Sequence, residues 1–328
     1  MNQHEKKISI NAFFQPQYGL IWVLFIMLII FSFFSEPFRS IDNLLEILRQ
    51  SGIMAIMVVG LTWIVATGEI DVSFPNVVSF ATIITAFCLK SGLSWEAACL
   101  LAVIAGTMFG VISGFLVVFL KFPSLIATIA TMTMARSIAS IISSGKHIHI
   151  GRTGGFVYEL VYGTVYSIPI LFLITVGIYL ICRYLQDSTT TGQHLYALGE
   201  NRQATLEAGI KERKILMSFF ILSATLSAFG GVLLTAQLNS GNPNIGGKFF
   251  IDGMTVVFLG AMIIKAGQPN VIGTLIGVII LSVLSNGLTM LGIPFYVGTI
   301  IKGVLLVFGI VVVTFAKYQR RGEQLQVV

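Results

Sequence analysis

Residues 186–214 read QDSTTTGQHLYALGENRQATLEAGIKERK, a polar stretch in a chain whose charged residues make up only 10% of the total. Its charged side chains are Asp187, Glu200, Arg202, Glu207, Lys211, Glu212, Arg213 and Lys214. Long apolar runs flank the stretch on both sides. Because a lipid-exposed segment cannot carry this many charges, we expect a water-exposed loop between two membrane spans.

A short helix is predicted inside this loop. Asn201 belongs to the residue types that cap helix N-termini with their side chains, and Gly209 to the type that ends helices. The helix would run through Ala204, Leu206 and Ala208 and carry one face of small residues. We interpret this helix as the contact through which a second protein moves the membrane part, and an ordinary solvated loop is the alternative.

Composition places the whole chain in a membrane. It is 55% hydrophobic over 328 residues, with a mean hydropathy of +0.91. Soluble domains have about 45–50% apolar and about 25% charged residues. We therefore predict an all-α polytopic membrane protein with a single transmembrane domain, residues 1–328, and attribute the net charge of +6 to cytoplasmic Lys and Arg, with no nucleic-acid partner. The three cysteines, Cys88, Cys99 and Cys182, lie in apolar runs without paired spacing and indicate neither disulfide nor metal site.

About twenty mostly apolar residues are needed to cross a bilayer as a helix. Ten segments approach this length: 18–34, 52–67, 74–90, 94–120, 123–144, 166–185, 214–238, 249–264, 271–290 and 295–316. The second, third and eighth are short, so we expect them to be tilted, broken or partly re-entrant. An even number of spans leaves both termini on the same side.

The distribution of Lys and Arg predicts which side that is. Twelve fall on the side of the termini and six on the other, while Arg136 and Lys302 lie within spans. Because cytoplasmic loops carry the excess of positive charge, both termini and the 186–214 loop are expected in the cytoplasm.

Two aspartates suggest an internal repeat. Asp71 follows the second span and Asp252 the seventh, and each is expected beside the start of a new helix, where it can cap free N–H groups. A division into five and five spans would place the two on opposite membrane faces, as in an inverted repeat. Separately, residues 40–50 have helical apolar spacing, which fits either an interfacial helix or an extension of the next span.

No enzyme signature is present. The chain has no phosphate-binding loop for ATP, and His147 with His149 makes at best a weak metal pair. Arg136 and Lys302 are costly at membrane depth and either line a pathway or pair structurally, with Asp252 or Glu69 as conceivable partners. The polar residues that are candidates for a pathway are Asp71, Ser73, Asn76, Thr128, Asp252 and Asn286.

Several segments together resemble the permease subunits of carbohydrate-importing ABC transporters, the ribose, arabinose, xylose and autoinducer-2 group. Residues 67–73, TGEIDVS, are similar to the family's TGGIDLS segment. Residues 192–210 are similar to its GxxxYAxGxNxxAAxxxGI coupling segment. Residues 228–231, 257–260 with 272–277, and 286–292 add further matches, so the resemblance runs from about residue 40 to 316.

The resemblance implies a non-enzymatic translocation subunit that works by alternating access in the inner membrane of a bacterium. It implies a cytosolic ABC ATPase that binds ATP and magnesium, a solute-binding protein, and a second permease chain, with no cofactor on this chain. The ATPase-coupling residues would be Glu200, Asn201, Arg202, Gln203, Ala204, Thr205, Leu206, Glu207, Ala208 and Gly209. Candidates for meeting an acidic binding protein are Arg39, Arg49, Lys146 and Arg152, and anchoring at lipid headgroups is the alternative for them.

The sequence departs from the family where relatives often read Glu-Ala-Ala and this chain has Arg202-Gln203-Ala204. This departure makes an unusual choice of ATPase conceivable. The expected cargo is a sugar or sugar-like solute. The alternatives are an amino-acid or nucleoside importer of the same superfamily, and a stand-alone secondary carrier.

Overall fold

The computed structural model describes residues 19–151, 154–264 and 267–321. The long helices are α1 (Gly19–Phe34), α2 (Ile41–Ala66), α3 (Phe74–Lys90), α4 (Trp95–Val118), α5 (Ser124–Ser143), α7 (Ile170–Ser188), α10 (Glu212–Leu238), α11 (Gly246–Gly260), α12 (Val271–Met290) and α13 (Phe295–Arg321). The short elements are η3 (Pro37–Arg39), β1 (Ile148–His149), α6 (Phe156–Tyr162), β2 (Thr164–Val165), β3 (Ile168–Pro169), α8 (Thr190–Glu200), α9 (Arg202–Glu207) and β4 (Ser240–Gly241).

Each of the ten predicted spans corresponds to one long helix, which confirms an all-α polytopic membrane protein. Among the described residues, seven of these helices are long and apolar enough to cross a membrane. The other three are shorter: α1 has 16 residues, α3 has 17 and α11 has 15. The shortness of the third and eighth spans was predicted, whereas the second span is lengthened by residues 41–51 and forms the 26-residue α2.

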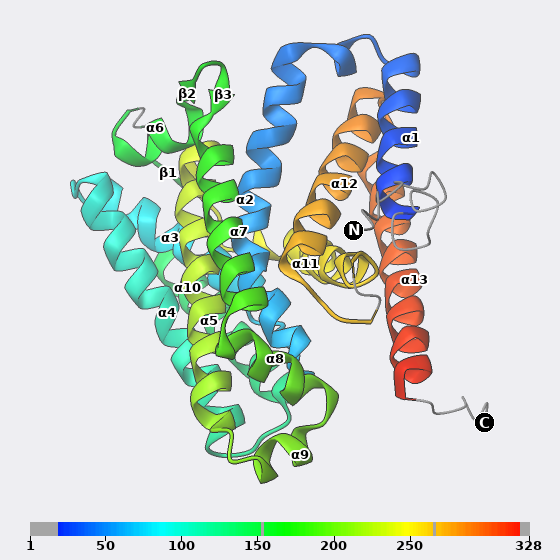
Figure 1. The fold of residues 1–328 in the computed structure, drawn as a ribbon. Helices are drawn as coiled ribbons and strands as arrows, with labels where there is room; N and C mark the ends of the chain where they lie inside the picture. Colours follow the sequence, from blue (N-terminus) through cyan, green and yellow to red (C-terminus); the bar gives the residue numbers. More distant parts are fainter. Residues whose placement is uncertain (1–18, 152–153, 265–266, 322–328) are drawn as a thin grey trace, which may run out of the picture.

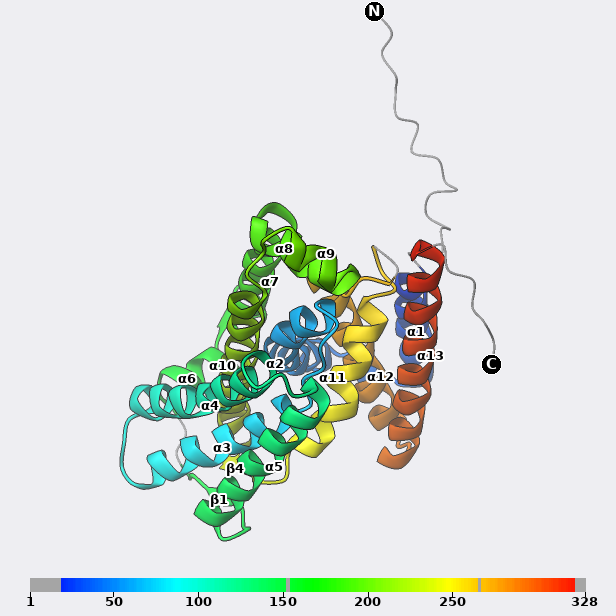
Figure 2. The same cartoon turned by 90° about the horizontal axis from the view of Figure 1, so that it is seen from below.

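Helix α2 forms the centre of the bundle. Every residue from Ser51 to Ala66 is buried, because α7, α10, α11 and α12 pack around it. Figure 2 shows α2 near the middle, with α4 on one side and α1 and α13 at the opposite edge. Helix α13 exposes most of its apolar side chains, as expected of a helix that faces lipid or another subunit.

Glycines allow the closest contacts between helices. A Cβ at Gly110 of α4 would lie 2.5 Å from the Phe220 carbonyl oxygen of α10, and one at Gly60 of α2 would lie 2.5 Å from the Ser223 Cα of α10. Only a residue without a side chain fits at these two positions.

Residues 40–50 extend a span instead of forming a separate interfacial helix. Ser40 is the N-cap of α2, and its hydroxyl accepts a hydrogen bond of 3.2 Å from the Asn43 N–H. The helix then runs without interruption to Ala66. Of the two interpretations, the extension is therefore the correct one.

The predicted capping role of Asp252 is wrong. Helix α11 begins at Gly246, so Asp252 lies in its second turn and not at its start. The Gly246 N–H at the start of the helix is held instead by Ser79 Oγ at 2.7 Å. Asp71 does lie just before α3 and accepts a hydrogen bond of 2.8 Å from the Ser73 N–H. The two aspartates thus do not occupy equivalent positions relative to the helices α3 and α11.

Helix packing nevertheless follows the order that five and five spans require. In the first five spans α3 packs on α4 and α5, and in the last five α11 packs on α12 and α13. Between the two halves, α10 packs on α3 and α4, and α2 packs on α11 and α12. Matching hydroxyl pairs join α2 to α12 (Thr62 to Thr274, 2.8 Å) and α10 to α4 (Thr225 to Thr107, 2.9 Å). This order supports an inverted repeat, which stays a prediction.

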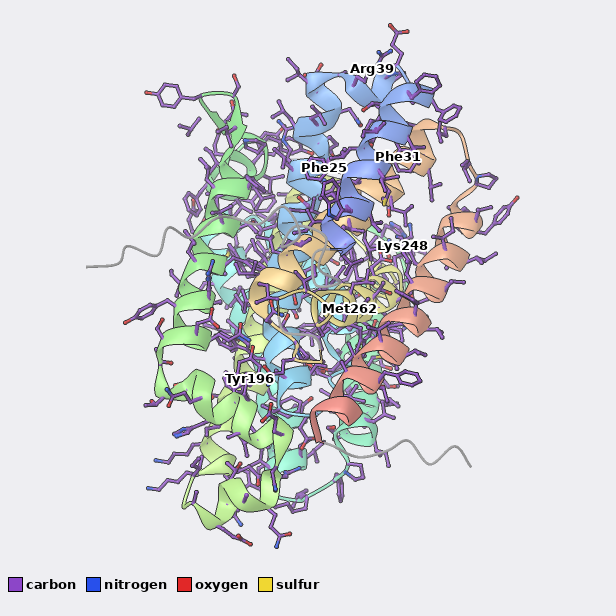
Figure 3. The ribbon with its side chains drawn as sticks, turned by 45° about the vertical axis from the view of Figure 1, so that its right-hand side comes forward. Phe25, Phe31, Arg39, Tyr196, Lys248 and Met262 are labelled. Carbon is purple, nitrogen blue, oxygen red and sulfur yellow. The ribbon has the colours of Figure 1, made fainter. Side chains whose placement is uncertain are left out.

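The short elements gather at two opposite ends of the bundle (Figure 1). Helices α8 and α9 lie at one end. The other end carries η3, α6, the β2–β3 hairpin, and β1, which pairs antiparallel with β4. Figure 3 shows Arg39 at this second end and Tyr196 of α8 toward the first.

Candidate functional site

Helix α9 begins and ends as its sequence predicts. The Asn201 side chain accepts a hydrogen bond of 3.0 Å from the Ala204 N–H at its start. At its end, Gly209 has a φ of +79°, a left-handed conformation that glycine adopts without steric cost. The Gly209 and Ile210 N–H groups bond back to the Leu206 and Thr205 carbonyls at 2.9 and 3.3 Å. Both ends are therefore fixed by local chemistry.

The surface of α9 is open to a partner. Thr205 is the buried residue of the helix, whereas the small residues Ala204 and Ala208 and the apolar Leu206, which is 50% exposed, face outward. These exposed side chains are accessible to another protein. The predicted small-residue face is thus present at the surface.

One arginine fastens α9 to the transmembrane helices. The Arg202 Nη1 atom lies 2.8 Å from Glu69 Oε1, just after α2, and Nη2 contacts Glu212 Oε1 at the start of α10. Hydrogen bonding to Glu212, and then the charges of Glu212 and Glu69, raise the pKa of the Arg202 guanidinium above its usual value. Lys121, between α4 and α5, lies 3.7 Å from the same Glu212 oxygen.

Helix α8 precedes α9 and was not predicted. Its buried residues Gly192, Leu195 and Leu198 recur at three-residue spacing, a signal that indicates helix when it is looked for inside a polar loop. Gln186 holds it in place: its Nε2 donates to the Tyr196 hydroxyl at 2.6 Å, and its Oε1 accepts from the Val271 N–H of α12 at 2.9 Å. The loop is therefore a folded unit attached to α2, α10 and α12.

The Glu200 side chain at the end of α8 contacts Gln268, in the segment before α12. Of the other predicted coupling residues, Gln203 and Glu207 are exposed and bond to each other at 3.3 Å. The ten predicted residues, which are consecutive in the chain, thus lie at one end of the bundle. Whether an ATPase contacts them stays a prediction.

The pathway candidates near α3 are buried and hydrogen-bonded to neighbouring helices or to one another. Asp71 accepts hydrogen bonds from the Ser73 hydroxyl and, at 3.1 Å, from the Ser223 hydroxyl of α10. Thr128 of α5 accepts from the Val72 N–H at 3.2 Å. Asn76 donates to the Met132 carbonyl at 3.2 Å. These groups join helices in this structure, and their role in a pathway stays a prediction.

Asn286 of α12 pairs with the side chain of Asn43 in α2. Its Nδ2 donates to Asn43 Oδ1 at 2.8 Å, and the Asn43 amide donates back to Asn286 Oδ1 at 3.0 Å. Both side chains are buried. This reciprocal pair joins the first turns of α2 to α12.

Asp252 lines a cavity of about 950 Å³ between α2, α10, α11, α12 and α13. Its carboxylate lies 2.8 Å from Lys302 Nζ, which confirms one of the two partners considered for that lysine. Polar side chains in the wall include Glu46, Gln50, Gln237, Ser285, Thr289 and Thr299. Figure 3 shows Lys248, which also lines the cavity, at a level between Arg39 and Tyr196.

Arg136 pairs with neither suggested acid. Its Nη2 donates to Asn244 Oδ1 at 3.1 Å on the exposed surface of α5. Glu69, the other suggested partner, is bound by Arg202. The opposite charges of Glu69 and Arg202 are compatible with an ion pair. The two residues lie too far apart in the sequence for a local pattern to predict that they meet.

The candidates for a binding protein differ in their surroundings. Arg39 and Lys146 are exposed, and Arg39 lies at the end opposite α8 (Figure 3). Arg49 is half-buried, 3.5 Å from Glu46 and over the Tyr162 ring. Partial burial raises the pKa of Tyr162, whose neutral hydroxyl donates to the Gln237 carbonyl at 2.9 Å. Arg152 lies outside the described residues.

Within the described ranges, no group of three His, Cys, Asp or Glu side chains is arranged to hold a metal ion. His147 and His149 are exposed near β1. The three cysteines are free thiols.

Comparison with known proteins identifies the family. The sequence model described as "Branched-chain amino acid transport system / permease component" matches residues 43–310. The ribose import permease protein RbsC of Haemophilus influenzae is 32% identical over 312 residues, 94% of this chain and 96% of the relative. RbsC of Escherichia coli is 30% identical over 92% of this chain and 94% of the relative, and the L-arabinose permease AraH of Escherichia coli is 26% identical over 94% and 92%.

No solved structure matches the chain. The family match covers every helix from α2 to α12, including the α8–α9 segment and the start of α13. Because it spans well over half of the sequence, and because relatives at 30% identity or more align along nearly their full length, this chain is a multi-pass membrane protein that belongs to the family of transport-system permease components.

Proposed function

We propose that the chain is the membrane-spanning subunit of an ABC importer for a sugar or sugar-like solute. The observation that carries the proposal is helix α9: it is capped at both ends, exposed on one face, and joined by Arg202 to α2 and α10. Similarity to ribose and arabinose permeases supports the solute class. The chain itself is not an enzyme in this scheme.

The fuel-consuming step would take place on a cytosolic ABC ATPase, which would bind ATP and magnesium. With the ATPase in the cytosol, α9 and both termini would lie in the cytoplasm, and the protein would lie in the inner membrane of a bacterium. A solute-binding protein would dock at the opposite end, where Arg39 and Lys146 are exposed. A second permease chain, identical or not, would complete the pathway.

The energy requirement is modest. A ligand or partner shifts a conformational equilibrium only by its differential affinity for the two states. Moving the population from mostly inward to mostly outward takes about 5 kcal/mol. Contacts of an ATPase with Ala204, Leu206 and Ala208 supply this if they fit one conformation better than the other.

The cavity beside Asp252 suits a neutral polyhydroxylated solute. Its wall combines amides, hydroxyls and the charge-balanced Asp252–Lys302 pair. Sugar hydroxyls both donate and accept hydrogen bonds, as do the amide and hydroxyl groups of Gln50, Gln237 and Ser285. A strongly charged solute would meet no surplus of opposite charge there.

The test is reconstitution in proteoliposomes with the cognate ATPase and binding protein. Uptake of ribose, arabinose or another pentose or hexose is expected only with hydrolysable ATP, and not with an ATPase variant that cannot hydrolyse it. Uptake by the permease alone, driven by an ion gradient, would contradict the proposal and indicate a secondary carrier.

The family description favours a second candidate, a branched-chain amino-acid importer. The same proteoliposomes distinguish the two. ATP-dependent uptake of leucine, isoleucine or valine with no uptake of sugars would establish this second candidate. A nucleoside importer would be recognised in the same way.

A further inference from the structure

Charged side chains from four segments meet where α9 joins the bundle. Arg202 of α9 lies between Glu69, in the break between α2 and α3, and Glu212, the first residue of α10. Lys121 from the α4–α5 connection completes the group at 3.7 Å from Glu212. Glu212 is only 3% exposed and Glu69 is 13% exposed, whereas Arg202 is 46% exposed, so solvent screens their interactions with Arg202 only in part.

Arg202 is the polar side-chain link between α9 and the other elements. Among the described residues, it makes all the side-chain hydrogen bonds and ion pairs that join α9 to other elements. Gln203 bonds only to Glu207 of the same helix, and the Thr205 hydroxyl donates to the Asn201 carbonyl at the start of that helix. A displacement of α9 is therefore transmitted through Arg202, through the packing of the buried Thr205, and through the peptide chain.

Glu69 belongs to a segment that is held tightly to the helices around it. The Ile70 N–H donates to Ser124 Oγ of α5 at 3.1 Å, and the Val72 N–H donates to Thr128 Oγ1 at 3.2 Å. Ser223 of α10 donates to Asp71 at 3.1 Å. Residues 69–73 thus connect the Arg202 ion pair directly to α3, α5 and α10.

The chemistry of Arg202 suits a contact with two acids. Its Nη1 atom binds Glu69 and its Nη2 atom binds Glu212. An arginine can bind two carboxylates at once through separate nitrogens, which a lysine does less well.

We propose, resting on the function proposed above, that Arg202 is the positioning residue through which movement of α9 reaches the break between α2 and α3. Its bonds to Glu69 and Glu212 set the coupling between ATP hydrolysis and transport. They are not needed for the ATPase to dock, because docking uses the outer face of α9.

The experiment is a double-mutant cycle on the assembled transporter, with Glu69→Gln, Arg202→Gln and the double variant. Each is assayed for membrane abundance, for ATPase that co-purifies, and for the ratio of ATPase activity with and without solute-loaded binding protein. In Glu69→Gln we expect docking to be unchanged and the stimulation ratio to fall about tenfold, the effect of losing one hydrogen bond between charged groups. The fall is expected to be larger in Arg202→Gln, which loses its contacts to both Glu69 and Glu212, and the double variant is expected to be no worse than Arg202→Gln alone.

Two further variants sharpen the test. Arg202→Lys keeps the charge and is expected to restore part of the stimulation. Arg183→Gln, at the same end of the molecule, removes an arginine from the exposed pair with Asp187 (3.6 Å) and is expected to behave like wild type. Should Arg202→Gln accumulate poorly, Glu69→Gln still tests the same contact from the other side.

Wild-type stimulation in Glu69→Gln would overturn the proposal, and so would independent losses that multiply in the double variant. Loss of co-purified ATPase in Arg202→Gln, with Glu69→Gln like wild type, would show instead that Arg202 contacts the ATPase itself. These outcomes differ from failure of the proposed function, in which wild type shows no ATP-dependent uptake at all.

Discussion

The Lys302 ammonium of α13 lies 2.8 Å from the Asp252 carboxylate of α11, and the two side chains are only 16% and 17% exposed. This ion pair closes part of the wall of the cavity and holds the largely exposed α13 against the bundle. An unpaired charge at this depth would be costly, whereas the pair is tolerated.

Removing one member of this pair is expected to destabilise the protein more than removing both. Asp252→Asn leaves an uncompensated ammonium, and Lys302→Gln an uncompensated carboxylate. The loss should lie between the ~1 kcal/mol of an exposed pair and the ~3–5 kcal/mol of a fully buried one. Thermal unfolding of the purified permease in detergent measures it, and the double variant should regain part of the loss. Strictly additive losses would show that the two side chains do not interact.

The reciprocal pair of Asn43 and Asn286 is expected to act on stability. Asn286→Ala leaves the buried Asn43 Oδ1 atom without its donor, although Asn43 Nδ2 keeps its bond to the Phe38 carbonyl at 3.0 Å; the unsatisfied oxygen costs ~1–3 kcal/mol. The melting temperature should fall while the solute dependence of uptake by the surviving protein stays the same. A changed solute dependence at unchanged stability would instead support Asn286 as a pathway residue.

Gly60→Ala is expected to impair folding because a Cβ there would lie 2.5 Å from the Ser223 Cα of α10. The central helices would have to separate, and overpacking of this kind costs ~1–3 kcal/mol or more. Gly177→Ala on α7 is the matched control: nothing lies within 4 Å of its Cβ, so it should be neutral or stabilise the helix by ~0.5–1 kcal/mol. Membrane abundance and thermal unfolding are compared for the two variants. Equal behaviour would contradict the close α2–α10 contact.

Gly209→Val is expected to abolish binding of the ATPase while membrane insertion stays intact. Nothing lies within 4 Å of a Cβ at this position, so the effect comes from the backbone: the left-handed conformation costs a non-glycine residue ~1–2 kcal/mol, and more when it is β-branched. Helix α9 would then end differently and present another surface. Gly209→Asn, which tolerates this conformation, should retain binding in a co-purification assay. Unchanged co-purification and transport in the valine variant would argue against α9 as the coupling element.

Much of the fold could be predicted because the governing constraints are local. In lipid each backbone polar group must be satisfied within its own helix, so a long apolar run is sufficient evidence of a span. The start and end of α9 were predicted for the same reason, since Asn201 bonds to Ala204 three residues away and the conformation of Gly209 depends on its own backbone. Helix α8 was missed because its buried face consists of only three residues in a polar segment.

The sequence by itself determined an all-α membrane protein, the positions of its ten long helices and a capped helix in its longest polar loop, because apolar length and capping act between near neighbours. Only the tertiary structure decided that Asp252 lies within α11 and pairs with Lys302, that Asn286 bonds to Asn43, and that Arg202 joins Glu69. These partners lie 50, 243 and 133 residues apart in the chain. Which charge meets which depends on how the helices pack, and packing brings together residues that no local spacing connects.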